Sequence, residues 1–135
     1  MTKGFAIAWV ASLVAFALLD FIWLSSTVNT VYRPRLGSLL AESPVIWAAV
    51  LFYLLYGAGL ASFVIRPAMA EGSVVTALWM GAVFGLVAYG TYDLTNLATL
   101  KDWSVSLSAI DMAWGTVLTG AAATIGVWIG QKFAA

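Results

Sequence analysis

Three aspartates, Asp20, Asp93 and Asp111, lie inside long apolar stretches of this sequence. A carboxyl group in apolar surroundings can carry a proton, hold a cation or bind a polar group of a ligand, and it is costly to bury without a partner. No lysine or arginine lies within the same stretches, so we expect that at least one carboxyl is protonated or that a cation is present. The chain has neither cysteine nor histidine, which excludes disulfides, thiolate zinc sites, iron–sulfur clusters and histidine-ligated haem.

The composition indicates that the apolar stretches cross a membrane. Of the 135 residues, 63% are apolar and only 9% are charged, and the mean hydropathy is +0.99. A soluble domain has about a quarter of its residues charged, so water cannot be the main solvent of this chain. Its formal net charge of zero also gives no basic excess that would point to nucleic acid.

Four stretches have the length of about 20 residues that a membrane-spanning helix needs. They cover residues 5–29, 44–65, 74–97 and 103–129, and short polar connections join them. Backbone groups in lipid must be hydrogen-bonded within the protein, so the spans should be helices. The sequence therefore predicts an all-α, four-helix transmembrane bundle, with residues 1–135 forming a single integral membrane domain.

The first span has a second interpretation. Lys3, the apolar run 5–14 and the small residues that follow are typical of a cleavable signal peptide. The apolar run continues to Leu24, which is long enough to span the bilayer, so we expect an uncleaved helix. Both termini should then lie on one side of the membrane (side A), with the first and third connections on the other (side B). Three basic residues fall on each side, so the positive-inside rule gives no orientation.

The three aspartates should lie at the same depth in the membrane. Each is eight or nine residues from the side-B end of its span, which corresponds to roughly 12–14 Å at the rise of an α-helix. Tyr53 of the second span lies at a matching position. Because polar faces should turn away from lipid, we expect the three carboxyls to converge in one site in the side-B half of the bundle.

Residues three and four positions apart share a face of a helix. This spacing joins Asp93 to aromatic and amide side chains of the third span, and it places a tryptophan three residues after both Asp20 and Asp111. The predicted ligand-binding set is Asp20, Trp23, Tyr53, Tyr89, Tyr92, Asp93, Asn96, Asp111 and Trp114. The sequence assigns no catalytic residue or cofactor, and it predicts no metal site, because no Asp-x-x-Asp or Asp-x-x-x-Asp pair occurs.

Other marked residues have structural interpretations. We expect Arg33 and Arg35 to contact lipid head groups at the side-B interface and not to enter the site. The small-residue pairs Gly81/Gly85 and Gly126/Gly130 predict close helix packing, with a homodimer seam as the alternative. Five aromatic residues near span ends predict belts at the two interfaces; they are Trp9, Tyr32, Trp47, Trp103 and Trp128.

Several motifs resemble those of a known family. They are the run from Tyr89 to Lys101 (Tyr-Gly-Thr-Tyr-Asp-Leu-Thr-Asn-Leu-Ala-Thr-Leu-Lys) followed by Trp103, the Asp-Met-Ala-Trp-Gly segment at 111–115, the Asp-Phe-Ile-Trp-Leu segment at 20–24, and Phe52-Tyr53. Together they resemble the signature of a family of predicted bacterial membrane proteins that is catalogued as a domain of unknown function. The resemblance implies a multi-pass, four-span protein of the bacterial cytoplasmic (inner) membrane with no established reaction. It also implies that lipid-modifying enzymes are often encoded nearby.

Three functions remain open. The first is a membrane-embedded binding or accessory protein whose acidic, aromatic-lined pocket holds a lipid or other amphipathic small molecule, alone or for a partner membrane enzyme. The second is a small proton- or cation-coupled transporter that uses the intramembrane acids. The third is a metal-dependent lipid-modifying enzyme, in which the three aspartates hold a hard cation. We place them in that order, with the lipid bilayer as the common partner, and whether the protein is an enzyme stays open.

Overall fold

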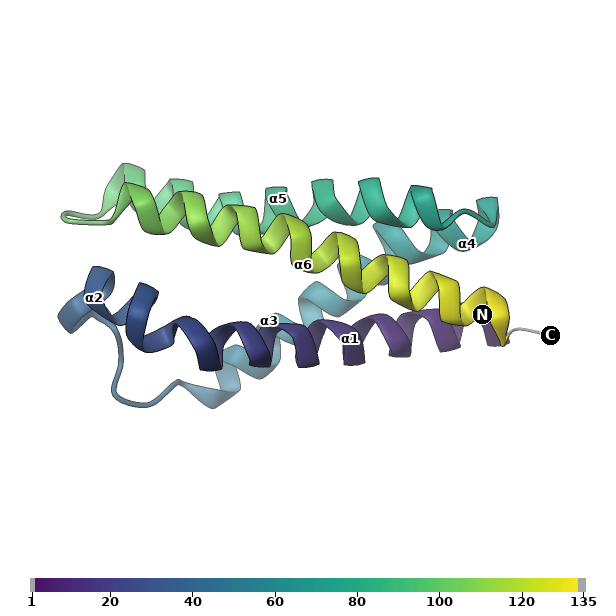
Figure 1. Ribbon diagram of the computed structural model, residues 1–135, viewed down its shortest axis with the longest axis horizontal. Coiled ribbons are helices and arrows are strands. Elements are labelled where there is room, and N and C mark those ends of the chain that lie inside the picture. The colour runs from purple at the N-terminus through teal and green to yellow at the C-terminus, as the bar shows by residue number, and fades with distance from the viewer. Residues whose placement is uncertain (1, 134–135) are drawn as a thin grey trace.

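Four long helical stretches make up the architecture. The computed structural model describes residues 2–133. Within that part, four stretches are long and apolar enough to cross a membrane: Lys3–Leu39, Ile46–Glu71, Val74–Thr99 and Val105–Lys132. They form an elongated bundle in which α1 begins and α6 ends at the same end (Figure 1), which is side A. The predicted all-α, four-helix transmembrane fold is confirmed.

The first two spans are longer than the sequence predicts because each continues as a helix through its proline. Helix α1 (Lys3–Thr27) passes through a π-helical turn, Val28–Tyr32, into the short helix α2 (Arg33–Leu36), and a 3₁₀ turn, Gly37–Leu39, ends the stretch. The helical stretch therefore takes up most of residues 30–43, predicted as a connection, and the connection begins after Leu39. Likewise α3 (Ile46–Leu60) passes through a π-helical turn, Ala61–Ile65, into α4 (Arg66–Glu71).

The π-helical turns explain how the prolines fit. A proline has no N–H, and in an α-helix its ring collides with the carbonyl four residues back. Before Pro34, the N–H of Arg33 donates to the carbonyl of Val28, five residues back, and Arg66 does the same to Ala61 before Pro67. Each proline then occupies the first turn of the next helix, where a missing N–H costs nothing.

Local capping defines the last two spans. Helix α5 (Val74–Thr99) begins after Ser73, whose hydroxyl accepts a hydrogen bond from the N–H of Thr76 at 3.1 Å. Helix α6 (Val105–Lys132) begins after Ser104, which accepts from the N–H of Leu107 at 3.0 Å. Serine at this position satisfies a backbone donor that the first helical turn leaves free. These spans therefore start at or close to the positions that the sequence predicts.

Helix α6 packs closely against both α5 and α1 through glycines. A Cβ atom added to Gly81 would lie 2.9 Å from the backbone oxygen of Thr119, and one added to Gly130 would lie 2.6 Å from the Cβ atom of Ala8. Contacts of this length are too short for a side chain, so the glycines allow the backbones to approach. Close packing is confirmed, and because these faces are covered within the chain, they offer no homodimer seam.

The bundle buries polar side chains within an apolar core and exposes large apolar ones. Between residues 2 and 133, seven polar side chains are buried: Ser12, Asp20, Thr76, Asp93, Ser108, Asp111 and Thr119. Meanwhile large apolar side chains such as Phe21 and Leu55 are more than two-thirds exposed. An exterior of this kind requires lipid around it. The chain is therefore a multi-pass membrane protein.

Span two is packed along only part of its length. From Ile46 to Leu55 no side chain is buried, whereas Tyr56, Gly57 and Leu60 are. In Figure 1 this span runs diagonally behind the others, from beside α1 at the side-B end toward α5 at side A. The first turns of α3 thus stand away from α5 in the half of the bundle that contains the aspartates.

Candidate ligand-binding site

Asp20 joins three of the four spans. Its side chain is buried on α1. One carboxyl oxygen accepts a hydrogen bond from the indole N–H of Trp114 on α6 at 3.1 Å, and the other accepts from the hydroxyl of Tyr53 on α3 at 3.2 Å. Hydrogen bonds to a carboxylate are the stronger kind, so Asp20 is a satisfied acid that ties α1, α3 and α6 together.

Asp111 is bound through the end of the first span. Its Oδ1 accepts a hydrogen bond from the hydroxyl of Tyr32 at 2.7 Å, and the same hydroxyl accepts from the indole N–H of Trp23 at 3.0 Å. The rings of Trp23 and Trp114 are stacked, with centroids 4.5 Å apart and planes 8° from parallel. One chain of hydrogen bonds and stacked rings therefore connects Asp111 to Asp20.

Asp93 differs from the other two acids because it has no donor. Its side chain is 0% exposed, and neither carboxyl oxygen has a hydrogen-bond partner among the described residues. The carboxyl of Asp111 is close enough to interact electrostatically with that of Asp93. Carboxylates are acceptors only, so two of them can bond to each other only by sharing a proton. The pair therefore needs either a proton or a cation between or beside its oxygens.

A cavity of about 310 Å³ opens next to this pair. It is lined by Phe52, Ala88, Tyr89, Tyr92 and Asp111. Phe52 on α3 and Tyr92 on α5 are 47% and 56% exposed, and they flank the segment where span two stands away from the bundle. The cavity therefore has aromatic walls, one carboxyl group and an exposed rim toward the surroundings of the helices.

The aromatic walls are held in position by neighbours. A Cβ atom on Gly115 would collide with the ring of Tyr89, so the absence of a side chain at position 115 is what lets this ring lie flat on α6. The ring of Tyr92 meets Trp103 edge to face, with centroids 5.6 Å apart. Such pairs favour a fixed ring orientation, so the cavity is at least partly preformed.

The residues predicted from sequence, apart from Asn96, fall into two groups. Asp20, Trp23, Tyr53 and Trp114 belong to the hydrogen-bonded and stacked network. Asp93 and Asp111 are adjacent, and Tyr89, Tyr92 and Asp111 line the cavity. Asn96 is not brought into either group, because no hydrogen bond of its side chain to these residues occurs in the described part of the chain. Between residues 2 and 133, no group of three or more acidic side chains gathers closely enough to ligate a metal ion.

Tyr32 has a place in the site that its position in the sequence did not indicate. It was predicted to belong to an interfacial belt, but its hydroxyl reaches Asp111. The π-helical turn carries the helix past residue 29 and turns this ring inward. The Arg-Pro steps at 33–34 and 66–67 both follow such a turn, but an Arg-Pro step more often marks the end of a helix. Phe52 and Ala88 were also missed as cavity residues.

The other residues near the span ends are either exposed or hydrogen-bonded to groups other than the three aspartates. Trp47 and Trp128 are exposed, as a belt requires, whereas the indole N–H groups of Trp9 and Trp103 donate to Gly57 and Ser108. Arg35 donates to the hydroxyl of Ser106 and the carbonyl of Val31, and Arg33 donates to Asn29. In residues 2–133 neither arginine forms an ion pair with the three aspartates, in agreement with the prediction.

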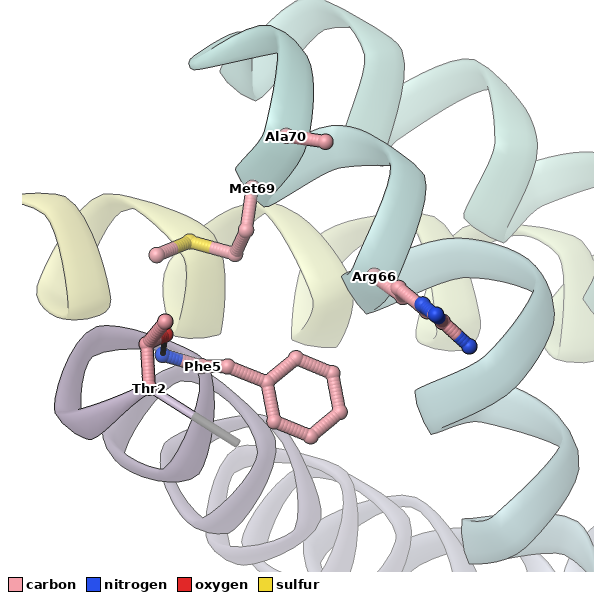
Figure 2. Close-up of a pocket in the computed structure, with 5 residues that line it drawn as sticks. All are labelled: Thr2, Phe5, Arg66, Met69 and Ala70. Atoms are coloured by element: carbon pink, nitrogen blue, oxygen red, sulfur yellow. Dashed lines mark hydrogen bonds between the residues drawn. The ribbon is translucent and has the colours of Figure 1, made fainter.

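A second cavity lies at the opposite end of the bundle. It measures about 540 Å³ and is lined by Thr2, Phe5, Arg66, Met69 and Ala70. Figure 2 shows Phe5 and Met69 between α1 and α4, while the guanidinium of Arg66 is directed away from Thr2 and Met69. No acidic residue lines this cavity, and none of the predicted site residues lies there. It is larger, but it lacks the convergent polar groups of the cavity beside Asp111.

Comparison with known proteins gives one match, at the level of the family. No curated protein and no solved structure matches the chain. A family described as "Predicted membrane protein (DUF2177)" matches residues 5–128, a range that contains all four spans almost entirely and every residue of the network and the cavity. This chain therefore belongs to the DUF2177 family of predicted membrane proteins, whose function is unknown.

Proposed function

We propose that this protein is a membrane-embedded binding or accessory protein that holds a lipid or other amphipathic small molecule in the cavity beside Asp111. The observation that carries the proposal is the cavity itself, in which aromatic walls surround one carboxyl group and the rim is exposed. Ligand sites are generally apolar hollows with a few placed polar groups. The polar end of the ligand would meet Asp111, and its apolar part would lie against Phe52 and Tyr92.

The position of span two supports entry from the bilayer. Because the side chains from Ile46 to Leu55 are unburied, a molecule in the lipid phase can reach the cavity between α3 and α5 without crossing the packed core. The volume of about 310 Å³ is at the lower end of the range for small-molecule sites. It suits a head group and the first part of a chain, with the rest of the chain in lipid.

The test is to identify what the protein retains on purification. The full-length chain, an Ala88→Leu variant that fills the cavity, and an Ala113→Leu control would be purified in mild detergent. Ala113 is exposed on α6, so the control adds the same side chain outside the cavity. Mass spectrometry of the bound small molecules should find a discrete molecule in the parent and the control, reduced about tenfold or more in Ala88→Leu. The same lipid background in all three proteins would contradict the proposal.

A small proton- or cation-coupled transporter is the second candidate, and one observation favours it. Asp93 is a buried acid without a donor, adjacent to Asp111, and intramembrane acids of this kind occur on proton and ion pathways. In proteoliposomes, a transporter would show proton-coupled uptake that Asp93→Asn abolishes. Uptake by a protein that purifies without a bound molecule would favour this candidate. The metal-dependent enzyme has no such support, because the acids do not gather into a ligand set.

A further inference from the structure

We propose that the cavity beside Asp111 selects amphipathic molecules whose polar end is a positively charged amine or quaternary ammonium group. This inference rests on the proposed binding function, and it names the class of ligand. Three properties of the described residues carry it: the charge balance of the site, the unsatisfied acid next to Asp111, and the aromatic walls of the cavity.

The charge balance around the cavity is negative. The basic residues of the described chain are Lys3, Arg33, Arg35, Arg66, Lys101 and Lys132, all near the ends of the spans. Arg33 and Arg35 lie near the side-B end of the first span, and their hydrogen bonds go to Asn29, Ser106 and the carbonyl of Val31. No lysine or arginine is among the residues that line the cavity. An anionic head group there would meet Asp111 with no basic side chain in the cavity wall, and like charges at close range disfavour binding.

The adjacent acid makes a cation preferable to a neutral head group as well. Asp93 is fully buried, and neither of its oxygens has a donor. Asp111 receives one hydrogen bond, from Tyr32, and it is the member of the pair that lines the cavity. A cationic group held against Asp111 would supply the positive charge that two neighbouring carboxyls lack. A hydroxyl or sugar head group could donate a hydrogen bond, but it would leave that charge uncompensated.

The aromatic residues provide the second half of an ammonium site. Rings of Phe52, Tyr89 and Tyr92 line the same cavity as the carboxyl. The face of an aromatic ring attracts a cation, more strongly when water is excluded, and cages of such rings recognise quaternary ammonium groups. Two of these rings are fixed by contacts with Gly115 and Trp103. A rigid aromatic wall facing a carboxyl therefore fits this head group better than a phosphate or a carboxylate.

The test compares three amphiphiles with the same twelve-carbon chain. Dodecyltrimethylammonium, dodecanol and dodecanoate would be mixed in equal amounts, below their micellar concentrations, with the full-length protein, and native mass spectrometry would count the bound molecules. The ammonium compound should be retained about tenfold more than dodecanol, with dodecanoate retained least. Asp111→Asn and Asp93→Asn should each reduce ammonium binding about tenfold or more and leave dodecanol binding unchanged.

Matched variants separate charge from fold. Asp102→Asn makes the same chemical change in the α5–α6 turn, where the backbone φ is 60°, a conformation that asparagine adopts readily; it should leave binding unchanged. Asp93→Asn introduces an amide donor beside Asp111, so it should not unfold the bundle. Tyr92→Phe keeps the ring and should keep ammonium binding, whereas Tyr92→Leu removes the ring and should weaken that binding about tenfold.

The outcomes distinguish this inference from the proposed function. Equal binding of dodecanol and the ammonium compound, insensitive to both aspartate variants but lost in Ala88→Leu, would refute the ammonium preference and leave the binding function standing. Binding of none of the three amphiphiles above the level of Ala88→Leu would overturn both. A melting temperature measured for every variant shows that lost binding does not come from unfolding.

Discussion

The stacked indoles of Trp23 and Trp114 are linked by hydrogen bonds to two different acids. Trp114 donates to Asp20 directly, whereas Trp23 donates to Tyr32, which in turn donates to Asp111. With centroids 4.5 Å apart, the pair links the first span to the fourth in the side-B half. The stack holds α1 against α6 in the side-B half. Near side A, glycine contacts join the same two helices, which approach too closely there for large side chains.

Replacing Trp114 with phenylalanine should destabilise the bundle by about 1–2 kcal/mol. The variant keeps part of the stack but removes the hydrogen bond to Asp20. Interhelical hydrogen bonds in membranes contribute about 0.6 kcal/mol on average, and stacked pairs add about 0.5–1.5 kcal/mol. Reversible unfolding in mixed micelles measures the difference. Trp47→Phe, at an exposed position on α3, should change stability by less than about 0.5 kcal/mol. Equal losses in both variants would mean that the stack is not structural.

Tyr32 and Asp111 should be energetically coupled. A double-mutant cycle with Tyr32→Phe and Asp111→Asn, read by the same unfolding assay, should give a coupling energy of about 0.5–1.5 kcal/mol. The control cycle pairs Asp111→Asn with Tyr53→Phe. Tyr53 bonds to Asp20 and not to Asp111, so its effect should be nearly additive. Additive effects in the first cycle would contradict the coupling, and Tyr32 would then act only as a residue of the interfacial belt.

Alanine should be tolerated at Gly90 and not at Gly85. A Cβ atom on Gly85 would collide with the backbone oxygen of Gly115 on α6. One on Gly90 would meet the flexible ends of Met112, at 3.2 Å, and Leu94, at 3.9 Å. Overpacking of a close contact costs about 1–3 kcal/mol. Thermal unfolding in detergent should therefore show a clear loss for Gly85→Ala and little change for Gly90→Ala. Similar melting temperatures would show that α5 and α6 can separate without cost.

The four-span topology can be tested with single cysteines, because the chain has none of its own. Ser38→Cys and Lys101→Cys report on side B, and Ala70→Cys and Gln131→Cys report on side A. A membrane-impermeant thiol reagent applied to intact cells should label one pair and leave the other for labelling after lysis. The result would also give the orientation of the protein, which the even distribution of basic residues leaves undetermined. Labelling of Ala70→Cys from the same face as Ser38→Cys would contradict the topology.

The sequence predicted the fold well because span formation is a local property. Twenty apolar residues in a row require a helix in lipid, and Ser73 and Ser104 cap α5 and α6 through bonds to residues three positions ahead. The first two spans were predicted too short because Arg-Pro is normally a place where helices end. Whether the helix continues through an Arg-Pro step depends on a π-helical turn, and no local sequence pattern indicates that turn.

The sequence predicted a common depth for the three aspartates but not which of them become neighbours, and this difference has a physical cause. Depth in the membrane follows from counting residues along a helix, so the sequence alone placed Asp20, Asp93 and Asp111 at one level. Which acids become neighbours depends on the rotation of each helix about its axis and on the angles at which helices cross, and these are set by packing. Tertiary structure therefore decided that Asp93 lies beside Asp111, while Asp20 is satisfied by Trp114 and Tyr53.

What the sequence by itself determined is a multi-pass bundle with acids in one half of its interior, because hydropathy and helical rise are properties of the chain. Only the tertiary structure decided that Tyr32 turns inward, that the first turns of α3 stand away from α5, and that a cavity opens between Phe52, Tyr92 and Asp111. Those features depend on whether side chains from segments far apart in the sequence come into contact. Such contacts cannot be derived from the position of a residue along its own helix.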